Sequence, residues 1–96
     1  MKINIKKIDK ELETSIPRYA KQGDAGLDLT ATSRRTDPKG YTEYGTNLAV
    51  EIPTGYVGLV FQRSSVSNKN MQLTNAVGVI DSGYRGEILF RFKPST

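Results

Sequence analysis

Residues 77–92 read VGVIDSGYRGEILFRF, and this stretch decides the fold class. Its two ends are rich in β-branched and aromatic side chains, which is typical of strands. Between these ends, residues 81–86 are rich in turn formers. The alternation of the second run places Ile88, Phe90 and Phe92 on one face. The stretch therefore predicts two strands joined as a β-hairpin.

The same strand pattern extends toward the middle of the chain. Residues 47–52 alternate between apolar and polar positions, and residues 56–61 continue as a second apolar run. Between them, residues 53–55 (PTG) are turn formers. We expect these two runs to form another hairpin.

The remaining segments complete an all-β prediction. Ile3 and Ile5 begin a short strand, and a further strand is expected around Leu27 and Leu29. Residues 32–45 (TSRRTDPKGYTEYG) are polar and predict a loop. Many short strands without a convincing helix predict a small barrel or sandwich.

The composition limits the chemistry available to this chain. Its 96 residues suit one domain, and Leu, Ile, Val and Phe make up about a quarter of them, above the level typical of disordered chains. The sequence has no Cys and no His, which excludes disulfides, thiol nucleophiles, thiolate zinc sites and Ser-His-Asp catalysis. Catalysis would have to rest on carboxylates, hydroxyls, backbone groups and a metal held by oxygen atoms.

Charge and hydropathy restrict the partners and the compartment. A net charge of +4 and a pI near 9.5 suit either an anionic partner or an ordinary solvated surface. The first ten residues, MKINIKKIDK, contain no apolar core or cleavage pattern, and no window approaches the length of a membrane span. We therefore expect no membrane association and a cytoplasmic protein, or an intracellular one if the source is viral.

Two polar segments could bind a cation or an anion. Asp28 alternates with Leu27 and Leu29, so it is either a solvated strand carboxylate or a carboxylate aimed at water molecules around a hard cation. Residues 62–69 (QRSSVSNK) form either an ordinary polar turn or an anion cradle, in which an Arg and two adjacent hydroxyls hold a phosphate.

A third segment could carry catalysis. Asp81 follows an apolar run, where partial desolvation would make its carboxylate a stronger base. Tyr84 offers a flat face to a sugar or base ring, and Gly78, Gly83 and Gly86 permit close backbone approach to a ligand. The alternative is simple turn chemistry, with Tyr84 packing across the strands.

In this order and at these separations, the three segments resemble the trimeric deoxyuridine triphosphatases (dUTPases). Residues 25–31 match the first motif of that family, residues 63–65 the second, and residues 78–87 the third, so the resemblance covers roughly four-fifths of the chain. It implies a small jelly-roll-like distorted β-barrel and a homotrimer with active sites at subunit interfaces. It also implies Mg²⁺-dependent hydrolysis of dUTP to dUMP and pyrophosphate, with no nucleic acid as partner.

The resemblance also implies a role for each residue of the third motif. Asp81 would activate the water that attacks the α-phosphate. Tyr84 would pack under the deoxyribose and leave no space for a 2′-hydroxyl, so that ribonucleotides are rejected. The uracil slot would be lined by Asn75, Gly78, Val79, Ile80 and Leu89.

The first two motifs would serve the phosphates and the metal. By the same resemblance, the phosphates would be held by Arg63, Ser64 and Ser65 of a neighbouring subunit. Asp28 would orient water molecules on Mg²⁺, which would itself bind phosphate oxygens.

The chain also departs from the family pattern. Asp24, Gln62 and Ser65 replace residues that are more usual in the motifs, and the fourth and fifth motifs have no counterpart. The resemblance therefore predicts one dUTPase-like domain over residues 1–96, truncated before its C-terminal strands and tail. Two alternatives stay open: a non-catalytic member that binds deoxyuridine nucleotides, and a dCTP deaminase. The deaminase is disfavoured because Arg91 stands where that family has its catalytic Glu.

Overall fold

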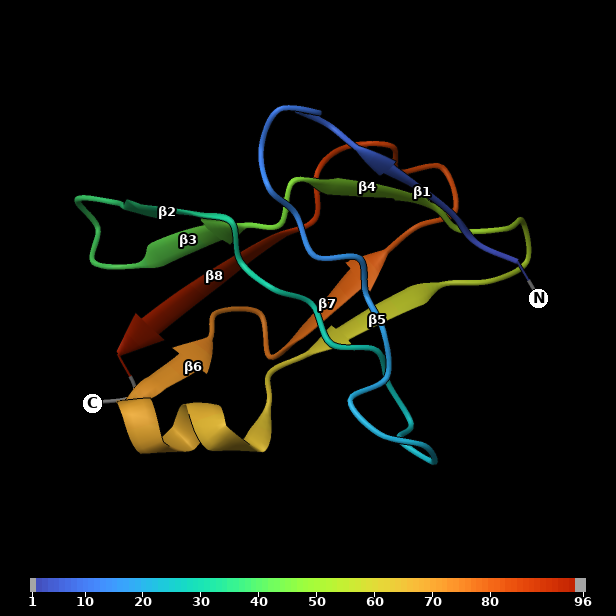
Figure 1. Cartoon of the computed structure of the whole chain (residues 1–96). Helices are drawn as coiled ribbons and strands as arrows, with labels where there is room; N and C mark the ends of the chain where they lie inside the picture. Colours follow the sequence, from blue (N-terminus) through green and yellow to red (C-terminus); the bar gives the residue numbers. More distant parts are fainter. Residues whose placement is uncertain (1, 95–96) are drawn as a thin grey trace.

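The computed structural model describes residues 2–94 (Figure 1). Strands dominate this range, as the sequence predicts, and a single 3₁₀ helix is present within it. No helix in the described range has the length and apolarity needed to cross a membrane. The elements in chain order are β1 (Asn4–Lys7), β2 (Ser33–Thr36), β3 (Thr42–Gly45), β4 (Leu48–Glu51), β5 (Gly58–Phe61), η1 (Ser64–Lys69), β6 (Met71–Leu73), β7 (Val77–Ile80) and β8 (Leu89–Pro94).

The described strands form three antiparallel sheets. β1 pairs with β4, β5 pairs with β7, and the largest sheet has the order β2-β3-β8-β6. In Figure 1 the β5–β7 pair is drawn to the right of the largest sheet and below the β1–β4 pair. β7 and β8 belong to different sheets. The loop that joins β7 to β8 therefore links different sheets, and this loop contains most of the third motif.

The predicted hairpin between residues 47–52 and 56–61 is wrong. Both strands exist, as β4 and β5, but they belong to different sheets. Between them the Tyr56 N–H donates to the Pro53 carbonyl at 3.0 Å, and Gly55 has a φ of 91°. These are features of a type II turn, which splays the flanking strands and does not match the twist of a paired hairpin.

The predicted hairpin over residues 77–92 is also wrong, because its two strands belong to different sheets. β7 pairs with β5, whereas β8 pairs with β3 and β6. The connecting loop, residues 81–88, ends at Ile88, whose N–H donates to the Leu48 carbonyl at 2.8 Å. The Ile88 carbonyl accepts the Thr46 hydroxyl at 2.9 Å. These bonds tie the end of the loop to the β3–β4 junction, so β8 enters the largest sheet.

The polar segment 32–45 is not a loop but the β2–β3 hairpin. Arg35 lies opposite Glu43 in the antiparallel register. At the tip, the Gly40 N–H donates to the Asp37 carbonyl at 2.9 Å, and Gly40 has a φ of 98°. Every residue of β2 is exposed, so burial imposes no apolar alternation on this edge strand and the sequence pattern misses it.

Of the two remaining strand predictions, one is confirmed and the other is wrong. The strand expected to begin at Ile3 and Ile5 is confirmed as β1. The strand expected around Leu27 and Leu29 does not form: within the described residues this segment contributes an isolated bridge between Arg18 and Asp28. Leu27 is half exposed, so the segment lacks the burial that would support a full strand.

The core is thin. Its buried apolar side chains are Leu48, Ala49, Ile52, Leu73 and Ile88, and the buried polar residues beside them are Thr46 and Asn47. Along β8 the more buried residues are Phe90 and Phe92, whereas Leu89 is exposed. This alternation confirms that Ile88, Phe90 and Phe92 share one face, which is the more buried one, and it leaves Leu89 on the other side.

Candidate functional site

A cavity of about 180 Å³ lies between the β5–β7 pair and the loop 81–88. Sites for drug-sized ligands measure roughly 300–1,000 Å³, so this one suits a single ring better than a whole nucleotide. Six residues expected from the sequence line it: Asn75, Gly78, Val79, Ile80, Tyr84 and Leu89. The structure therefore brings the predicted base-binding residues together.

The floor of the cavity depends on Gly78. A Cβ built there would lie 3.3 Å from the Cβ of Val60 and 3.7 Å from Nδ2 of Asn75. A side chain at this position would thus occupy space beside the Asn75 amide. Glycine keeps the β7 backbone accessible, and backbone groups with a side-chain amide can read the edge of a planar ligand.

Asn75 is presented by a tight turn. The Val77 N–H donates to the Asn75 carbonyl, and the residue between them, Ala76, has a φ of 60°. This i to i+2 bond around a positive φ is a strained form of γ-turn, and alanine adopts it at a cost. The turn ends β6 and places Asn75 at the mouth of the cavity just before β7 begins.

Tyr84 forms one wall of the cavity and is held at both ends. Its N–H donates to the Asp81 carbonyl at 3.0 Å, and its hydroxyl donates to the Glu87 carbonyl at 2.7 Å. A Cβ on Gly86 would lie 2.6 Å from the Tyr84 Oη. The ring is therefore folded back over Gly86, with a partly exposed face for a ligand.

Asp81 lies at the end of β7, directly after Ile80, and its backbone takes part in the turn that carries Tyr84. Its side chain is exposed. The partial desolvation that the preceding apolar run predicts is therefore absent from the single chain. Exposure leaves the carboxylate accessible to a water molecule or a bound ligand.

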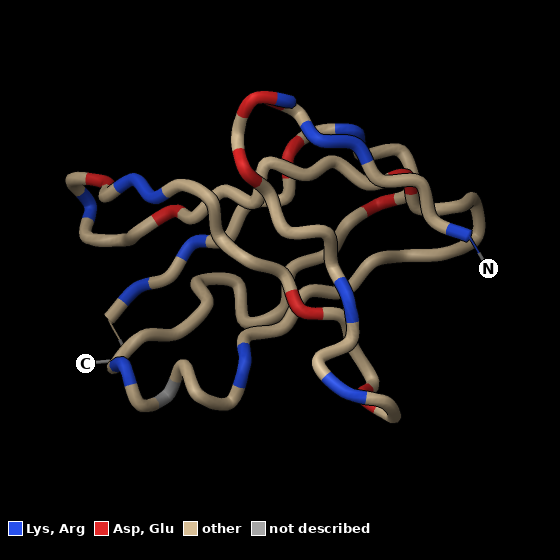
Figure 2. The backbone as a smooth tube through the Cα atoms, viewed as in Figure 1, with Lys and Arg blue, Asp and Glu red and all other residues tan. Residues whose placement is uncertain are grey.

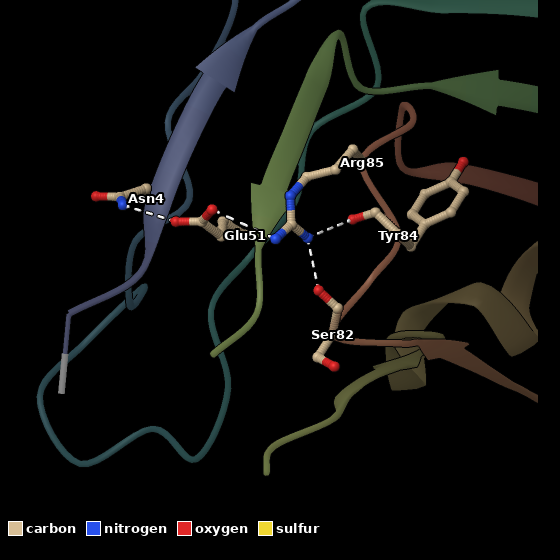
Figure 3. Close-up of polar contacts among 5 residues, drawn as sticks. All are labelled: Asn4, Glu51, Ser82, Tyr84 and Arg85. Atoms are coloured by element: carbon tan, nitrogen blue, oxygen red, sulfur yellow. Dashed lines mark hydrogen bonds and ion pairs between the residues drawn. The ribbon is translucent and has the colours of Figure 1, made fainter. Parts of the chain in front are cut away.

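Arg85 is a site residue that the sequence reasoning did not single out. Its Nη1 donates to the carbonyls of Ser82 (2.6 Å) and Tyr84 (3.2 Å), while its Nη2 lies 3.3 Å from Oε2 of Glu51 (Figure 3). The other oxygen of Glu51 accepts the Asn4 amide at 3.0 Å. These contacts connect the loop to β4 and β1.

Glu87 and Asn47 were also missed. The Glu87 carboxylate accepts the backbone N–H of Asn47 at 2.9 Å. Asn47 is buried with a φ of 60°, and its amide donates to the Asp9 carbonyl and to the Thr14 hydroxyl. An Asn that interrupts a strand pattern directly after Thr46 was the available signal, because Asn tolerates this backbone conformation.

The first two motifs lie along a second, wider groove of about 860 Å³. Asp28, Arg63 and Ser64 are among its lining residues, whereas Ser65 lines neither cavity. Nε of Arg63 lies 4.0 Å from Oδ1 of Asp28, and both side chains are substantially exposed. Within one chain the predicted site residues therefore line two separate cavities, and Asp81, like Ser65, lines neither of them.

The donor set argues against a metal held by the protein alone. The described residues contain no cluster of three or more carboxylates or other ligating side chains. Asp28 supplies one carboxylate beside the Arg63 guanidinium. Mg²⁺ is commonly held by one or two carboxylates, water molecules and substrate phosphates, so these residues fit an ion that arrives with a phosphorylated ligand.

The residues whose pKa values are shifted form a cluster away from both cavities, on the β2–β3 hairpin and β8. Hydrogen bonds from Arg91 and Arg35 lower the pKa of Glu43. The neighbouring Asp37, which accepts a hydrogen bond from the phenol, raises the pKa of Tyr41. Arg91 also lies 5.3 Å from the centre of the Tyr41 ring. This cluster has the character of a surface ion-pair network.

The molecule is a small all-β protein with a cavity of about the size of one ring and a separate, wider groove whose charged lining residues are Asp24, Asp28, Arg63 and Lys69. The sequence model of the dUTPase family matches residues 13–96, and the chain belongs to that family.

Relatives and solved structures agree with this assignment. The deoxyuridine 5′-triphosphate nucleotidohydrolase of Rhodococcus erythropolis is 40% identical over 101 residues, covering 100% of this chain and 60% of the relative. That of Corynebacterium glutamicum is 44% identical over 88 residues, covering 90% and 58%. The chain therefore spans about 60% of the length of these relatives.

A dUTPase of Staphylococcus aureus phage φ11, solved as a point variant with a structural Mg(II) ion, superposes with a TM-score of 0.82 at 29% identity. The match covers 99% of this chain and 61% of the phage protein. The predicted jelly-roll-like β-barrel of the dUTPase type is thereby confirmed.

Proposed function

We propose that the cavity of about 180 Å³ binds the uracil ring of deoxyuridine nucleotides and that the protein hydrolyses dUTP to dUMP and pyrophosphate. The observation that carries this proposal is the convergence of Asn75, residues 78–80 and Tyr84 on one small cavity. The Asn75 amide and the backbone of Val79 and Ile80 would bond the uracil edge. A slot of this size disfavours a 5-methyl group or a larger base.

Tyr84 is proposed to discriminate between sugars. Its hydroxyl is already bonded to the Glu87 carbonyl, so the ring, rather than the hydroxyl, faces the ligand. The deoxyribose would pack on this ring, and a 2′-hydroxyl would meet an apolar surface without a partner. An unpaired hydroxyl that loses its water costs binding free energy, which favours dUTP over UTP.

Asp81 is proposed as the general base. Two observations support this role: Asp81 is exposed to solvent, and its carbonyl accepts the N–H of Tyr84, so the two residues share one turn. From this turn its carboxylate would accept a proton from a water molecule. The water oxygen would form a bond to the α-phosphorus while the bond from that phosphorus to the bridging oxygen breaks. Pyrophosphate leaves, and the proton of the water passes to Asp81.

The phosphates are proposed to lie on Arg63, Ser64 and Ser65 of a neighbouring subunit, with Asp28 orienting water molecules on a phosphate-bound Mg²⁺. When bound, this ion would neutralise charge that develops on the phosphates. Within one chain Asp28, Arg63 and Ser64 border a different groove from the base pocket. A site completed between subunits would bring the two groups together.

An exposed apolar face supports the proposed homotrimer. On the β5–β7 pair, Leu59 lies opposite Val79 and Phe61 lies opposite Val77, and all four side chains are exposed. Leu59, Phe61 and Val79 each expose more than half of their surface. Adjacent exposed apolar residues of this kind mark a face that other copies of the chain can cover.

The test is pyrophosphate release from dUTP, UTP, dTTP and dCTP in the presence of Mg²⁺. The proposal expects release from dUTP well above that from the other three nucleotides. Binding of dUMP without any release would instead favour a non-catalytic nucleotide-binding member. A deaminase would convert dCTP to dUTP, but Arg91, at the position of the deaminase Glu, donates a 2.8 Å hydrogen bond to Glu43. That the 96 residues form one domain lacking C-terminal strands stays a prediction.

A further inference from the structure

We propose that Arg85 is a positioning residue that holds the loop between Asp81 and Tyr84 in its ligand-binding shape. This inference rests on the proposed function, because the loop carries the proposed base and sugar wall. It arises from the contacts of the Arg85 guanidinium, which are made to the loop backbone on one side and to β4 on the other (Figure 3).

The guanidinium adds to the backbone bond that closes this turn, from the Tyr84 N–H to the Asp81 carbonyl at 3.0 Å. Gly83, between the two bonded carbonyls, has nothing within 4 Å of its Cβ position. Both Ser82 and Tyr84 present their carbonyls to the same nitrogen, Nη1 of Arg85, at 2.6 and 3.2 Å. Hydrogen bonds from a charged donor are about twice as strong as neutral ones, so these two contacts hold the turn around a flexible glycine.

Glu51 fixes the guanidinium itself. It is the last residue of β4, and it lies opposite Asn4 in the β1–β4 register. One carboxylate oxygen lies 3.3 Å from Nη2 of Arg85, and the other accepts the Asn4 amide at 3.0 Å. The Arg85 and Glu51 side chains are about half exposed, so this pair adds little to overall stability. Its contribution is to orient the guanidinium toward the loop carbonyls.

The arrangement requires the shape of arginine as well as its charge. One nitrogen of the fork bonds the two carbonyls while another faces Glu51. A lysine ammonium is a single point of charge and cannot reproduce this forked geometry. Arg85→Lys is therefore expected to behave like Arg85→Ala, which separates positioning from a purely electrostatic effect.

The experiment compares Arg85→Ala, Arg85→Lys and Glu51→Gln with Arg35→Ala as a matched control. Arg35 is also an exposed arginine that pairs with a glutamate, here Glu43 at 3.1 Å, but it lies on the β2–β3 hairpin. Each variant is first checked for cooperative unfolding. Hydrogen exchange of the backbone amides in residues 82–88 is then measured, together with kcat and KM for dUTP and UTP.

Both Arg85 variants should exchange these amides several-fold faster than the unsubstituted protein. They should also lose about tenfold in kcat/KM for dUTP and show a smaller preference over UTP, because small displacements of reacting groups are costly. Glu51→Gln should give a smaller change in the same direction, and Arg35→Ala should change neither measurement.

Unchanged exchange in residues 82–88 of Arg85→Ala would overturn the inference, as would full recovery in Arg85→Lys. The exchange measurement needs no turnover, so it decides the role of Arg85 even if the unsubstituted protein fails to hydrolyse dUTP. That failure would count against the proposed function alone.

Discussion

The base pocket and the β2–β3 hairpin are built in opposite ways. The pocket is formed by glycines, apolar strand residues and backbone hydrogen bonds of the loop 81–88. The hairpin is held by Glu43, which binds both Arg35 and Arg91, and by the turn at Asp37. Figure 2 marks the charged residues along the backbone, and residues 52–62 and 70–80, which include β5, β6 and β7, contain none of them. Ion pairs therefore support an edge of this fold, whereas the proposed chemistry depends on the shape of the backbone.

The largest expected effect concerns Asp81. Asp81→Asn removes the proposed base but keeps the size of the side chain. It should therefore lower kcat for dUTP by about 100-fold or more, with little change in the affinity for dUMP. Asp37→Asn, on the hairpin, is the control and should keep kcat near that of the unsubstituted protein. Near-normal turnover in Asp81→Asn would remove Asp81 from the mechanism.

The next effect tests the wall of the pocket. Gly86→Ala places a Cβ 2.6 Å from the Tyr84 Oη, so the ring must move. We expect about a tenfold loss of dUMP affinity by calorimetry, equivalent to about 1.4 kcal/mol. Gly40 has nothing within 4 Å of its Cβ position, but its φ of 98° would strain an alanine, so Gly40→Ala is a poor control. Thr36→Ala, on the exposed strand β2 and away from both cavities, is the control and should bind dUMP normally.

On the hairpin the expected effect is on stability rather than on binding. Arg91 and Arg35 lower the folded-state pKa of Glu43, so this carboxylate stabilises the fold above its unfolded pKa. That stabilisation is lost as the pH falls through the lowered folded pKa. Glu43→Gln should reduce the free energy of unfolding by about 1 kcal/mol at neutral pH. The difference from the unsubstituted protein should shrink in acid, as measured by urea unfolding between pH 7 and pH 3.

A Glu43→Gln variant that binds dUMP less well would contradict the separation of the two regions. So would a stability difference that does not change with pH, since the difference is attributed to the ionised carboxylate.

The smallest expected effect returns to the pocket. Ala76 has a φ of 60°, which glycine adopts without strain. Ala76→Gly should therefore raise the free energy of unfolding by roughly 0.5 kcal/mol, because relief of strain exceeds the added flexibility of the unfolded chain. Ala49→Gly, inside β4, is the control and should lower it. Destabilisation by Ala76→Gly would show that the turn is not strained.

The strands could largely be predicted from the sequence, but their partners could not. β4, β5, β7 and β8 each alternate in burial or border the core, and this produces a visible apolar pattern. Pairing is decided by distant contacts, such as the bond from Ile88 to Leu48, which leave no periodic trace. The β2–β3 hairpin was missed because β2 is exposed on both faces.

The candidate site, like the fold, could be predicted from the sequence only in part. The family resemblance predicted six of the residues that line the cavity, because the third motif and the residues beside it match a known pattern of glycines and a tyrosine at fixed spacing. Arg85 and Glu87 act on backbone groups, so an ordinary turn could contain the same residues. The exposure of Asp81 could not be predicted, because an apolar run indicates burial of the strand and not of the residue that follows it.

The most direct test of the central claim is a titration of the isotopically labelled protein with dUMP, followed by amide chemical shifts, with UMP and dTMP as matched ligands. If the cavity binds uracil, dUMP perturbs the amide shifts of residues 75–80 and 84–89 first, and UMP and dTMP perturb them only at higher concentration. Perturbations confined to the β2–β3 hairpin, or equal responses to all three nucleotides, would contradict the claim.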